Sequence, residues 1–334
     1  MPGKYFRDPV HGEIFVSEEL LPIVADPIFQ RLRYVGQLGL AHIVYPSATH
    51  SRFSHSLGTY HITTRATSSL PTLAYALLHD IGHGPFSHLL EHALRHHGHN
   101  FDHEERMVDL LPDVLADSVL TPRDVLSSPE NPLVFGGVGA DRLDYISRDP
   151  YFAGISVGGI AWDRIIRNVS VSDSQLLVRY KILPNVEHVF VSRFILGDAL
   201  CFHKTVLIAN QMFVRGIGDL LDYYSPKELV EMDDVGLISA FRKTENRWWE
   251  MLEKRELFAL AFKDADKDRV LEEYERLASE LGEDNVLFGE RTSWHSPPRV
   301  IMEDGKPIEE VSPLVASLLD ADRTRYYYFV AVKR

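Results

Sequence analysis

Residues 73–88 read Leu-Ala-Tyr-Ala-Leu-Leu-His-Asp-Ile-Gly-His-Gly-Pro-Phe-Ser-His. The first six of these residues are mostly apolar, with Leu73, Leu77 and Leu78 at helical spacing, so they predict a buried helix. This helix ends on the adjacent pair His79-Asp80, which puts an imidazole and a carboxylate at one point. A His-Asp pair is common in proteins, so its meaning depends on what the rest of the chain brings to it.

Two further positions complete a metal-ligand set with this pair. His55 lies in the segment Ser-Arg-Phe-Ser-His-Ser (51–56), and Asp141 opens the segment Asp-Arg-Leu-Asp-Tyr (141–145). Two imidazoles and two carboxylates form a mixed nitrogen and oxygen shell, which suits a divalent ion such as Mn, Fe, Ni, Zn or Mg. We therefore predict one divalent metal ion held by His55, His79, Asp80 and Asp141.

The spacing around these ligands predicts neighbouring substrate contacts. Arg52 precedes His55 by three residues, and Asp141, Tyr145 and Arg148 follow helical spacing, so each set falls on one helix face. One face can then present a metal ligand together with a phosphate or sugar contact. A divalent ion lowers the pKa of bound water and offsets charge on a phosphoryl oxygen, and phosphoester hydrolysis requires both effects.

The segment 83–92, His-Gly-Pro-Phe-Ser-His-Leu-Leu-Glu-His, predicts acid-base groups beside the metal. His88 and Glu91 share a helix face, so we expect the carboxylate to orient the imidazole as a general acid or as support for the attacking water. His103 is expected to join them. The stretch 79–103 holds eight histidines, and some must be ordinary surface groups. We assign that role to His92, His96, His97 and His99.

Composition limits the classes of partner. The formal net charge of −13 opposes non-specific binding along nucleic acid, which depends on neutralising phosphates with Lys and Arg. A small anionic substrate remains compatible with this charge, because a metal ion and a few arginines act locally. The single cysteine, Cys201, excludes an internal disulfide, and no apolar stretch approaches the length that spans a bilayer. We expect a cytoplasmic protein without a membrane partner.

The patterns predict a mainly α-helical protein in two parts. Residues 1–225 are expected to form a helical core behind two short extended pieces around His11-Gly12, with helices over 85–97, starting at Pro85, and over 188–215. Residues 226–334 are expected to form a small α+β region. The elements predicted there are helices over 227–231, 234–254 and 266–281, strands over 285–288, 299–302 and 326–332, and a loop over 292–298.

Several ordered blocks resemble one known family. They are Asp-Pro-Val-His-Gly (8–12), Phe-Gln-Arg-Leu-Arg-Tyr (29–34), Gln-Leu-Gly (37–39), Arg-Phe-Ser-His-Ser-Leu-Gly (52–58), His-Asp-Ile-Gly-His-Gly-Pro-Phe-Ser-His (79–88), Asp-Arg-Leu-Asp-Tyr (141–145) and Arg-Asp (148–149). So many blocks in order resemble the HD-domain metal-dependent phosphohydrolases, and most closely their deoxynucleoside triphosphate triphosphohydrolase branch. The resemblance covers about residues 5–215, and we expect no extra regulatory domain before Asp8.

The resemblance implies a reaction and roles for named residues. The implied reaction is attack of metal-activated water on the α-phosphate of a (deoxy)nucleoside triphosphate, which releases the nucleoside and triphosphate. The implied metal ligands are the four predicted above. The residues implied around the scissile phosphate are His83, His88, Glu91 and His103. The implied phosphate contacts are Arg52, Arg142 and Arg193. The implied sugar contacts are Gln37, Leu38, Tyr145 and Asp149. Additional Mg with the nucleotide phosphates and a homo-oligomer are also implied.

Three positions depart from the family pattern. Gly197 and Cys201 stand where a histidine and a tyrosine face phosphate and sugar, so deoxyribose selection should be modest. Ala25 replaces a carboxylate that contacts an activating nucleotide, the nearest acid being Asp26, so activity without an activator is expected. Two alternatives therefore stay open. One is a phosphatase of another small phosphoester, such as a nucleoside monophosphate or a signalling nucleotide, and the other is a catalytically silent nucleotide-binding scaffold.

Overall fold

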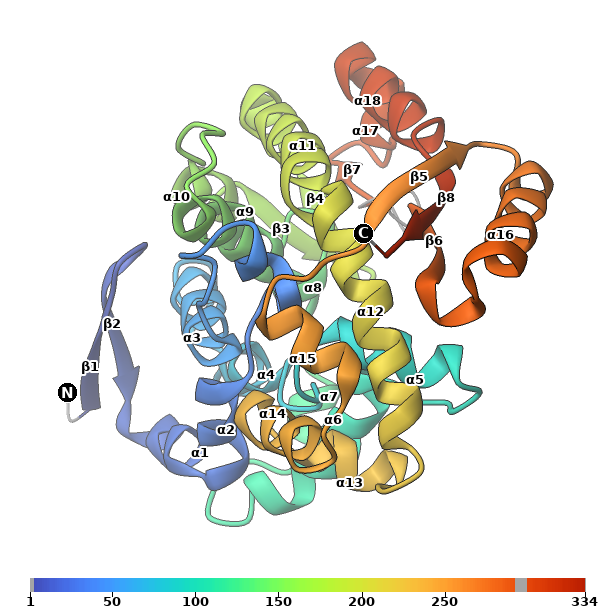
Figure 1. The fold of residues 1–334 in the computed structure, drawn as a ribbon. Coiled ribbons are helices and arrows are strands. Elements are labelled where there is room, and N and C mark those ends of the chain that lie inside the picture. Colours follow the sequence, from blue (N-terminus) through green and yellow to red (C-terminus); the bar gives the residue numbers. More distant parts are fainter. Residues whose placement is uncertain (1–2, 292–298, 334) are drawn as a thin grey trace.

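The computed structural model describes residues 3–291 and 299–333, so the predicted loop over 292–298 lies outside the described residues. Helices dominate the fold, with a hairpin at the N-terminus and small sheets formed largely by the C-terminal part of the chain (Figure 1). The predicted fold class, mainly α with short β elements at both ends, is confirmed. No helix in the described ranges has both the length and the apolar character needed to cross a membrane.

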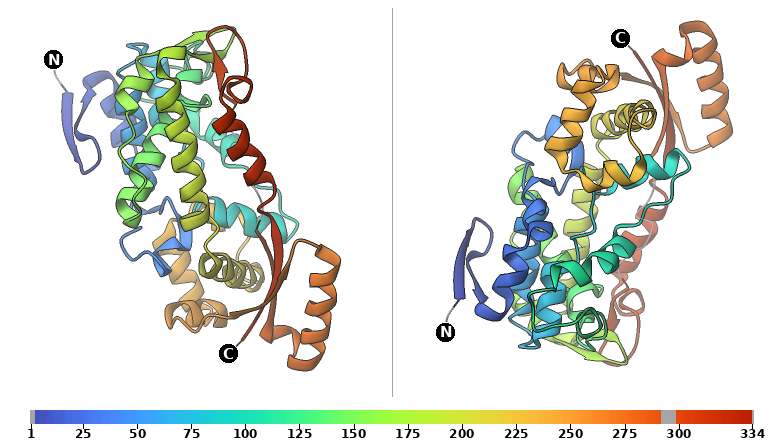
Figure 2. Two further views of the ribbon diagram at one scale, coloured as in Figure 1. Left: turned by 90° about the horizontal axis from the view of Figure 1, so that it is seen from above. Right: turned by 90° about the horizontal axis from the view of Figure 1, so that it is seen from below.

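The N-terminal hairpin consists of β1 (Gly3–Asp8) and β2 (Gly12–Ser17), which pair antiparallel with Asp8 opposite Gly12. The hairpin and the C-terminal sheet with its helix lie at opposite ends of the molecule (Figure 2). Asp8 shapes the hairpin turn, because its Oδ1 accepts hydrogen bonds from the backbone N–H groups of Val10 (2.9 Å) and His11 (2.8 Å). The turn is therefore a preformed element, and it directs His11 toward the helical core.

The helical core follows the hairpin. Its α-helices are α1 (Leu21–Ala25), α2 (Pro27–Arg31), α3 (Arg52–Thr63), α4 (Leu70–Leu78), α5 (His88–His96), α6 (His103–Val114), α7 (Pro122–Leu126), α8 (Pro132–Phe135), α9 (Ala140–Ala153) and α10 (Trp162–Ile166). Its 3₁₀ turns are η1 (Glu18–Leu20), η2 (Leu32–Tyr34) and η3 (Gly39–Ile43). Helix α3 is buried along nearly its whole length between α4 and α9. The predicted apolar helix before His79 is α4.

The predicted helix over 85–97 starts later than expected. Helix α5 begins at His88, because Phe86 (φ 56°) and Ser87 (φ 58°) have left-handed backbone conformations that no helix continues. Pro85 therefore belongs to a turn and not to the first helical turn. The sequence showed no glycine at either strained position, so nothing in it indicated the break.

The predicted helix over 188–215 is also interrupted. The chain instead forms α11 (Leu183–Leu196), the single π-helical turn η5 (Gly197–Cys201) and α12 (Lys204–Leu220). His203 caps α12 by accepting a hydrogen bond from Thr205 N (3.3 Å). π-Helical turns inside helices are frequent at functional sites, and this one places Leu200 and Cys201 on the wall of a cavity.

The C-terminal part is an α+β arrangement. It comprises α13 (Pro226–Glu231), α14 (Asp234–Lys243), α15 (Arg247–Glu253), β5 (Ala259–Asp264), α16 (Lys267–Leu281), η6 (Glu283–Asn285), β6 (Val286–Arg291), β7 (Ile301–Met302), α17 (Ile308–Val311), α18 (Pro313–Arg323) and β8 (Tyr327–Val332). The predicted helix over 234–254 is two helices, because Glu245 adopts a positive φ of 50° and Asn246 caps α15. Three of these strands form one sheet, in which β8 lies between β5 and β6 and is antiparallel to both.

A second three-stranded sheet was not predicted. It contains β3 (Val169–Ser172), β4 (Gln175–Val178) and β7, and the 3₁₀ turn η4 (Tyr180–Ile182) follows β4. Strands β3 and β4 have only four residues each, so their strand pattern is short. The division of the chain at residue 225/226 stays a prediction, although one apolar core contains residues from both sides of it, including Phe213, Phe241 and Phe329.

The contact between α3 and α9 depends on a glycine. A Cβ added at Gly58 would lie 1.9 Å from Asp144 Oδ1 and 2.5 Å from Arg148 Nη2. Only glycine therefore lets these two buried side chains pack against the backbone of α3. Gly159 is a matched comparison, because a Cβ there would meet nothing within 4 Å.

We predict that Gly58→Ala destabilises the protein by roughly 1–3 kcal/mol, the usual cost of overpacking a core. The added methyl group must push Asp144 and Arg148 from their positions. Gly159→Ala should leave the urea midpoint almost unchanged. Urea unfolding curves of the two variants and the parent check this, and equal stability of Gly58→Ala and the parent would mean that the helices do not approach as described.

Candidate metal centre and active site

Three separate elements bring the predicted metal ligands together. His55 lies on α3, His79 and Asp80 follow the end of α4, and Asp141 lies in the first turn of α9. The His79 backbone N–H still donates to Tyr75 O (2.9 Å), so the imidazole projects from the last turn of an apolar, buried helix. His79, Asp80 and Asp141 line one cavity, and the buried His55 contacts all three of them.

The donor atoms lie at distances that one ion can bridge. The Nε2 atoms of His55 and His79 are 3.4 Å apart, and Asp141 Oδ1 lies 3.1 Å from His55 Nε2 and 4.0 Å from His79 Nε2. Asp80 Oδ2 lies 3.6 Å from both Nε2 atoms. Metal–ligand bonds of about 2.1 Å put neighbouring ligands roughly 3 Å apart and opposite ligands roughly 4 Å apart. The separations of His55, His79 and Asp141 fit one shared divalent ion. Asp80 lies beside this group, and its role as the fourth ligand stays a prediction.

The other nitrogen of each imidazole is already engaged. His55 Nδ1–H donates to Asp144 Oδ2 (2.7 Å), and His79 Nδ1–H donates to Ala76 O (2.9 Å). A carboxylate and a carbonyl can only accept, so both rings carry the proton on Nδ1 and present the Nε2 lone pair to the centre. Metal-binding histidines are oriented in this way. The donor set therefore fits the predicted ion.

The charges of the cluster call for a cation. Burial alone would lower the pKa of His55, but its hydrogen bonds to Asp141 and Asp144 outweigh burial and raise this pKa to about 10. Burial opposes ionisation of Asp80 as well, yet the Arg52 guanidinium beside it holds the pKa of Asp80 well below its usual range. The three carboxylates around the His55 imidazole, those of Asp80, Asp141 and Asp144, thus attract a proton when no other cation is present. A divalent ion satisfies the same demand.

Asp144 is a functional residue that the sequence analysis did not assign. It is fully buried and accepts hydrogen bonds from His55 Nδ1, from His11 Nε2 (2.6 Å) and from Arg148 Nε (2.8 Å) and Nη2 (2.9 Å). Arg148 also donates to Asp8 Oδ2 (2.7 Å). The spacing of Asp141 and Asp144, three residues apart on one helix, was the available signal.

The helix face predicted on α9 was wrong at Arg148. The sequence grouped Arg148 with Asp141 and Tyr145 as a substrate contact, but its side chain is fully buried in the ion pairs with Asp144 and Asp8. Asp149, one residue further on, lines the cavity instead. The spacing i, i+4, i+8 from Asp141 therefore describes the cavity face better than the spacing i, i+4, i+7.

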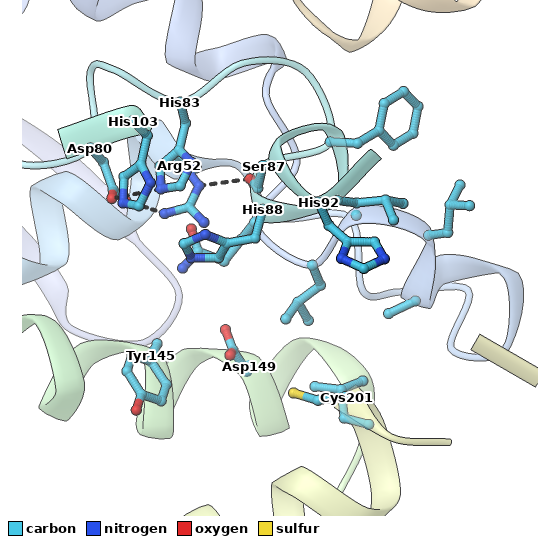
Figure 3. Close-up of a pocket in the computed structure, with 18 of the residues that line it drawn as sticks. Arg52, Asp80, His83, Ser87, His88, His92, His103, Tyr145, Asp149 and Cys201 are labelled. Atoms are coloured by element: carbon cyan, nitrogen blue, oxygen red, sulfur yellow. Dashed lines mark hydrogen bonds and ion pairs between the residues drawn. The ribbon is translucent and has the colours of Figure 1, made fainter. Parts of the chain in front are cut away.

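Arg52 connects the metal centre to the turn before α5. Its Nη1 donates to Asp80 Oδ2 (2.6 Å), and its Nε donates to Ser87 Oγ (2.7 Å) (Figure 3). The guanidinium is almost fully buried, yet it still lines the cavity. This position puts a fixed positive charge beside the metal ligands, where a bound phosphate would lie.

The predicted acid-base residues form a second cluster, with one change of partner. Donor atoms of His83, His88, Glu91 and His103 all lie within 4.8 Å of one another. Glu91 Oε2 accepts from His103 Nδ1 (2.8 Å), whereas His88 Nδ1 is 3.7 Å from that oxygen, beyond hydrogen-bonding distance. The expectation that Glu91 orients His88 stays a prediction, because the two side chains remain in contact while Glu91 hydrogen-bonds His103 more closely. The predicted helix face is correct, but α6 brings His103 closer.

This second cluster is poorly suited to an ion of its own. The rings of His83 and His103 are stacked, with centroids 3.9 Å apart and planes 13° apart. An imidazole binds a metal in the plane of its ring, so two stacked, nearly parallel rings do not direct lone pairs at one point. Glu91 is also engaged by Arg95 Nη2 (2.7 Å). We therefore assign the cluster to proton transfer.

The cavity has a volume of about 970 Å³, at the upper end of the range for small-molecule sites. Residues of both clusters line it, namely His79, Asp80, Asp141, His83, His88 and His103. The predicted sugar contacts Gln37, Leu38, Tyr145 and Asp149 all line it. Tyr145 and Asp149 lie on α9 across from Arg52 and the histidines (Figure 3). Gln37 Oε1 is buried and has no hydrogen-bond partner among the described residues, so it is available to a ligand.

The two other predicted phosphate contacts lie behind Tyr145. Arg142 donates to the backbone carbonyls of Gly136 (3.0 Å) and Gly137 (2.8 Å) and to Tyr145 Oη (3.2 Å). Arg193 is buried, and the Tyr145 hydroxyl group interacts with it as well. Neither arginine lines the cavity in this structure. Their role as phosphate contacts stays a prediction that requires them to turn toward the substrate.

Comparisons with known proteins agree with this site. The HD domain model matches residues 52–127, and the HD associated region model matches residues 160–283. The uncharacterized protein MJ1154 of Methanocaldococcus jannaschii is 32% identical over 94% of this chain and 76% of its own length. A Dictyostelium discoideum protein named deoxynucleoside triphosphate triphosphohydrolase SAMHD1 homolog is 28% identical over 75% of this chain, but the match spans only 57% of that relative.

A solved structure shows the same fold. The crystal structure of a phosphohydrolase from Bacteroides thetaiotaomicron superimposes with a TM-score of 0.83, at 25% identity, over 99% of this chain and 100% of that chain. The chain therefore belongs to the HD-domain phosphohydrolases that carry an HD-associated region. The matched HD domain contains His55, His79 and Asp80, whereas Asp141 lies between the two matched regions.

We predict that Asp80→Ala and Asp141→Ala each lose the bound divalent ion, because each removes a carboxylate that faces the imidazole pair. Asp149→Asn is the matched control, since Asp149 lines the same cavity but contacts His50 (2.9 Å) and not the metal ligands. Elemental analysis of the purified proteins checks the metal content. Full occupancy in both alanine variants would refute the ligand assignment.

Proposed function

We propose that this HD-domain phosphohydrolase cleaves (deoxy)nucleoside triphosphates to nucleoside and triphosphate by attack of water at the α-phosphorus. The observation that carries the proposal is the joining of three features in one cavity. These are the cluster of His79, Asp80 and Asp141, which the buried His55 contacts, the buried Arg52 beside it, and a wall of hydrogen-bonding groups on α9. The naming of the Dictyostelium relative as a deoxynucleoside triphosphate triphosphohydrolase supports this choice of substrate.

Each part of the site has a distinct task in this reaction. A bound divalent ion supplies Lewis acidity at a phosphoryl oxygen and lowers the pKa of water. Arg52 holds a positive charge against the reacting phosphate and is kept in place by Asp80 and Ser87. The neighbouring histidines His83, His88 and His103 accept and return protons. The nucleoside end faces Gln37 and α9.

The pair His103 and Glu91 is suited to proton transfer. Burial opposes ionisation of Glu91, but hydrogen bonding to His103 and attraction by His88 outweigh it and lower the pKa of Glu91 well below its usual range. The carboxylate is thus always ionised at neutral pH and keeps the His103 proton on Nδ1. His88 has a 67% exposed side chain that lines the cavity, so it can reach a leaving-group oxygen.

One observation favours a second candidate, the hydrolysis of a phosphomonoester such as a nucleoside monophosphate. Among the described residues that line the cavity, Arg52 is the only arginine or lysine, and it is already paired with Asp80. The carboxylates that line the cavity are Asp80, Glu104, Asp141, Asp149 and Glu290. A triphosphate therefore needs accompanying Mg, or rotation of Arg142 and Arg193, whereas a single phosphate does not.

We predict that the enzyme with Mn or Mg converts a deoxynucleoside triphosphate to the nucleoside and intact triphosphate, with only a modest preference over the ribonucleotide and without an added activator. Chromatography of a nucleotide panel, with the phosphate product identified, measures this. Release of inorganic phosphate from monophosphates alone would select the second candidate. No turnover of any nucleotide with any metal would instead favour the silent scaffold.

We predict that His88→Ala keeps its metal but is slower by roughly 10²–10⁴, the usual contribution of an acid-base group. The reason is that His88 faces the cavity without contacting the metal ligands that the structure describes. His96→Ala is the matched control, because His96 is an exposed histidine on the same helix that does not line the cavity. Rate measurements with metal-loaded proteins decide, and equal rates for His88→Ala and the parent would remove His88 from the reaction.

A further inference from the structure

The turn between the metal ligand Asp80 and helix α5 holds a strained backbone. Phe86 and Ser87 are consecutive non-glycine residues with positive φ, 56° and 58°, which side chains rarely adopt. Each such residue is disfavoured and persists only where its surroundings impose it. The Phe86 side chain is buried in the core, which accounts for part of this constraint.

A carboxylate from the C-terminal part of the chain provides the rest of the constraint on this turn. Asp234, the first residue of α14, accepts hydrogen bonds from Phe86 N (2.7 Å) and from Gly36 N (2.9 Å). These two N–H groups belong to segments that are 50 residues apart in the sequence. Ser87 Oγ joins the same two segments by donating to Gly36 O (2.7 Å). The strained turn is thus tied to residue 36 at two points.

The tie continues to the metal ligands through a short path of direct contacts. Ser87 Oγ, held by Gly36 O, accepts from Arg52 Nε (2.7 Å), and Arg52 Nη1 donates to Asp80 Oδ2 (2.6 Å). Ser87 is also the residue before His88, so its backbone conformation sets where α5 and the acid-base cluster begin. A shift at Phe86 would therefore reach both Arg52 and His88.

We propose that Asp234 is a positioning residue of the active site, which holds the Phe86–Ser87 turn so that Arg52 and His88 face the substrate. Asp234 does not line the cavity itself, but it holds the backbone of Phe86, which does. Arg31 supports the same region, since it donates to the backbone carbonyls of Ile81 (3.1 Å), His83 (2.5 Å) and Met232 (2.9 Å). The C-terminal region therefore acts on catalysis through the backbone of this turn.

Burial disfavours an ionised carboxylate at this place, so its presence indicates a role that a neutral side chain could not fill. Burial raises the pKa of Asp234 to about 6, even though its two backbone hydrogen bonds favour the ionised form. A neutral side chain would avoid that desolvation. Only a carboxylate, however, offers an acceptor to both N–H groups at once. An asparagine would satisfy one of them and set its own N–H₂ against the other.

The test uses Asp234→Asn with Asp233→Ala as the matched control. Asp233 is the neighbouring residue and caps α14 by accepting from Gly236 N (2.8 Å), without contacting the turn. Hydrogen–deuterium exchange should show faster exchange of the Gly36 and Phe86 amides in Asp234→Asn and no change at these amides in Asp233→Ala. This measurement needs no substrate, so its outcome is independent of the proposed function.

Activity supplies the second measurement. With the generic substrate p-nitrophenyl phosphate and with nucleotides, kcat of metal-loaded Asp234→Asn should fall roughly 10–100-fold, as expected for a supporting residue, while Asp233→Ala keeps the parental kcat. Unchanged exchange at Gly36 and Phe86 would overturn the proposal. So would faster exchange with parental kcat, or an equal loss of kcat in both variants. If the parental enzyme hydrolysed none of these substrates, the proposed function would be refuted. The exchange measurement would still test whether Asp234 holds the turn.

Discussion

The buried carboxylate of Asp144 is the constraint on which the site depends. It has no exposed surface and accepts hydrogen bonds from His55, His11 and Arg148, which come from α3, the N-terminal hairpin and its own helix. A buried charge is tolerated only when it is paired and hydrogen-bonded. The three elements must therefore assemble together, and their assembly turns the Nε2 lone pair of His55 toward the metal position.

The active site consists of layers that have different tasks. The predicted metal ligands lie together, and Arg52 links Asp80 to the turn before α5. The stacked His83 and His103 lie next to them, with His83 Nε2 3.4 Å from Asp80 Oδ1. The outer supports come from distant parts of the sequence, with Asp8 and His11 at one end and Asp234 at the other. Side chains from the hairpin before the HD domain and from the HD-associated region after it therefore help to hold the site residues in place.

Local sequence patterns indicated which residues would meet around the predicted metal position, but not the residues that support them. His55, His79, Asp80 and Asp141 could be proposed as ligands because ligand chemistry restricts both residue type and neighbours, and the structure brings these four side chains together. Asp144, Ser87 and Asp234 could not be predicted, because their roles follow from contacts between segments that the sequence does not place side by side. The breaks at 86–87, 197–201 and 245 were missed for a related reason. Positive φ at Phe86 and Glu245 is imposed by packing and hydrogen bonds, not by a glycine that the sequence would show.

We propose that one ion binds between His55, His79, Asp80 and Asp141, while the neighbouring His83, His88, Glu91 and His103 cluster stays free for proton transfer. Anomalous diffraction from crystals grown with Mn locates the ion directly. We predict one strong peak within bonding distance of His55 Nε2, His79 Nε2 and both aspartates. A peak among His83, His88 and His103, or no ordered peak at the first position, would contradict this account.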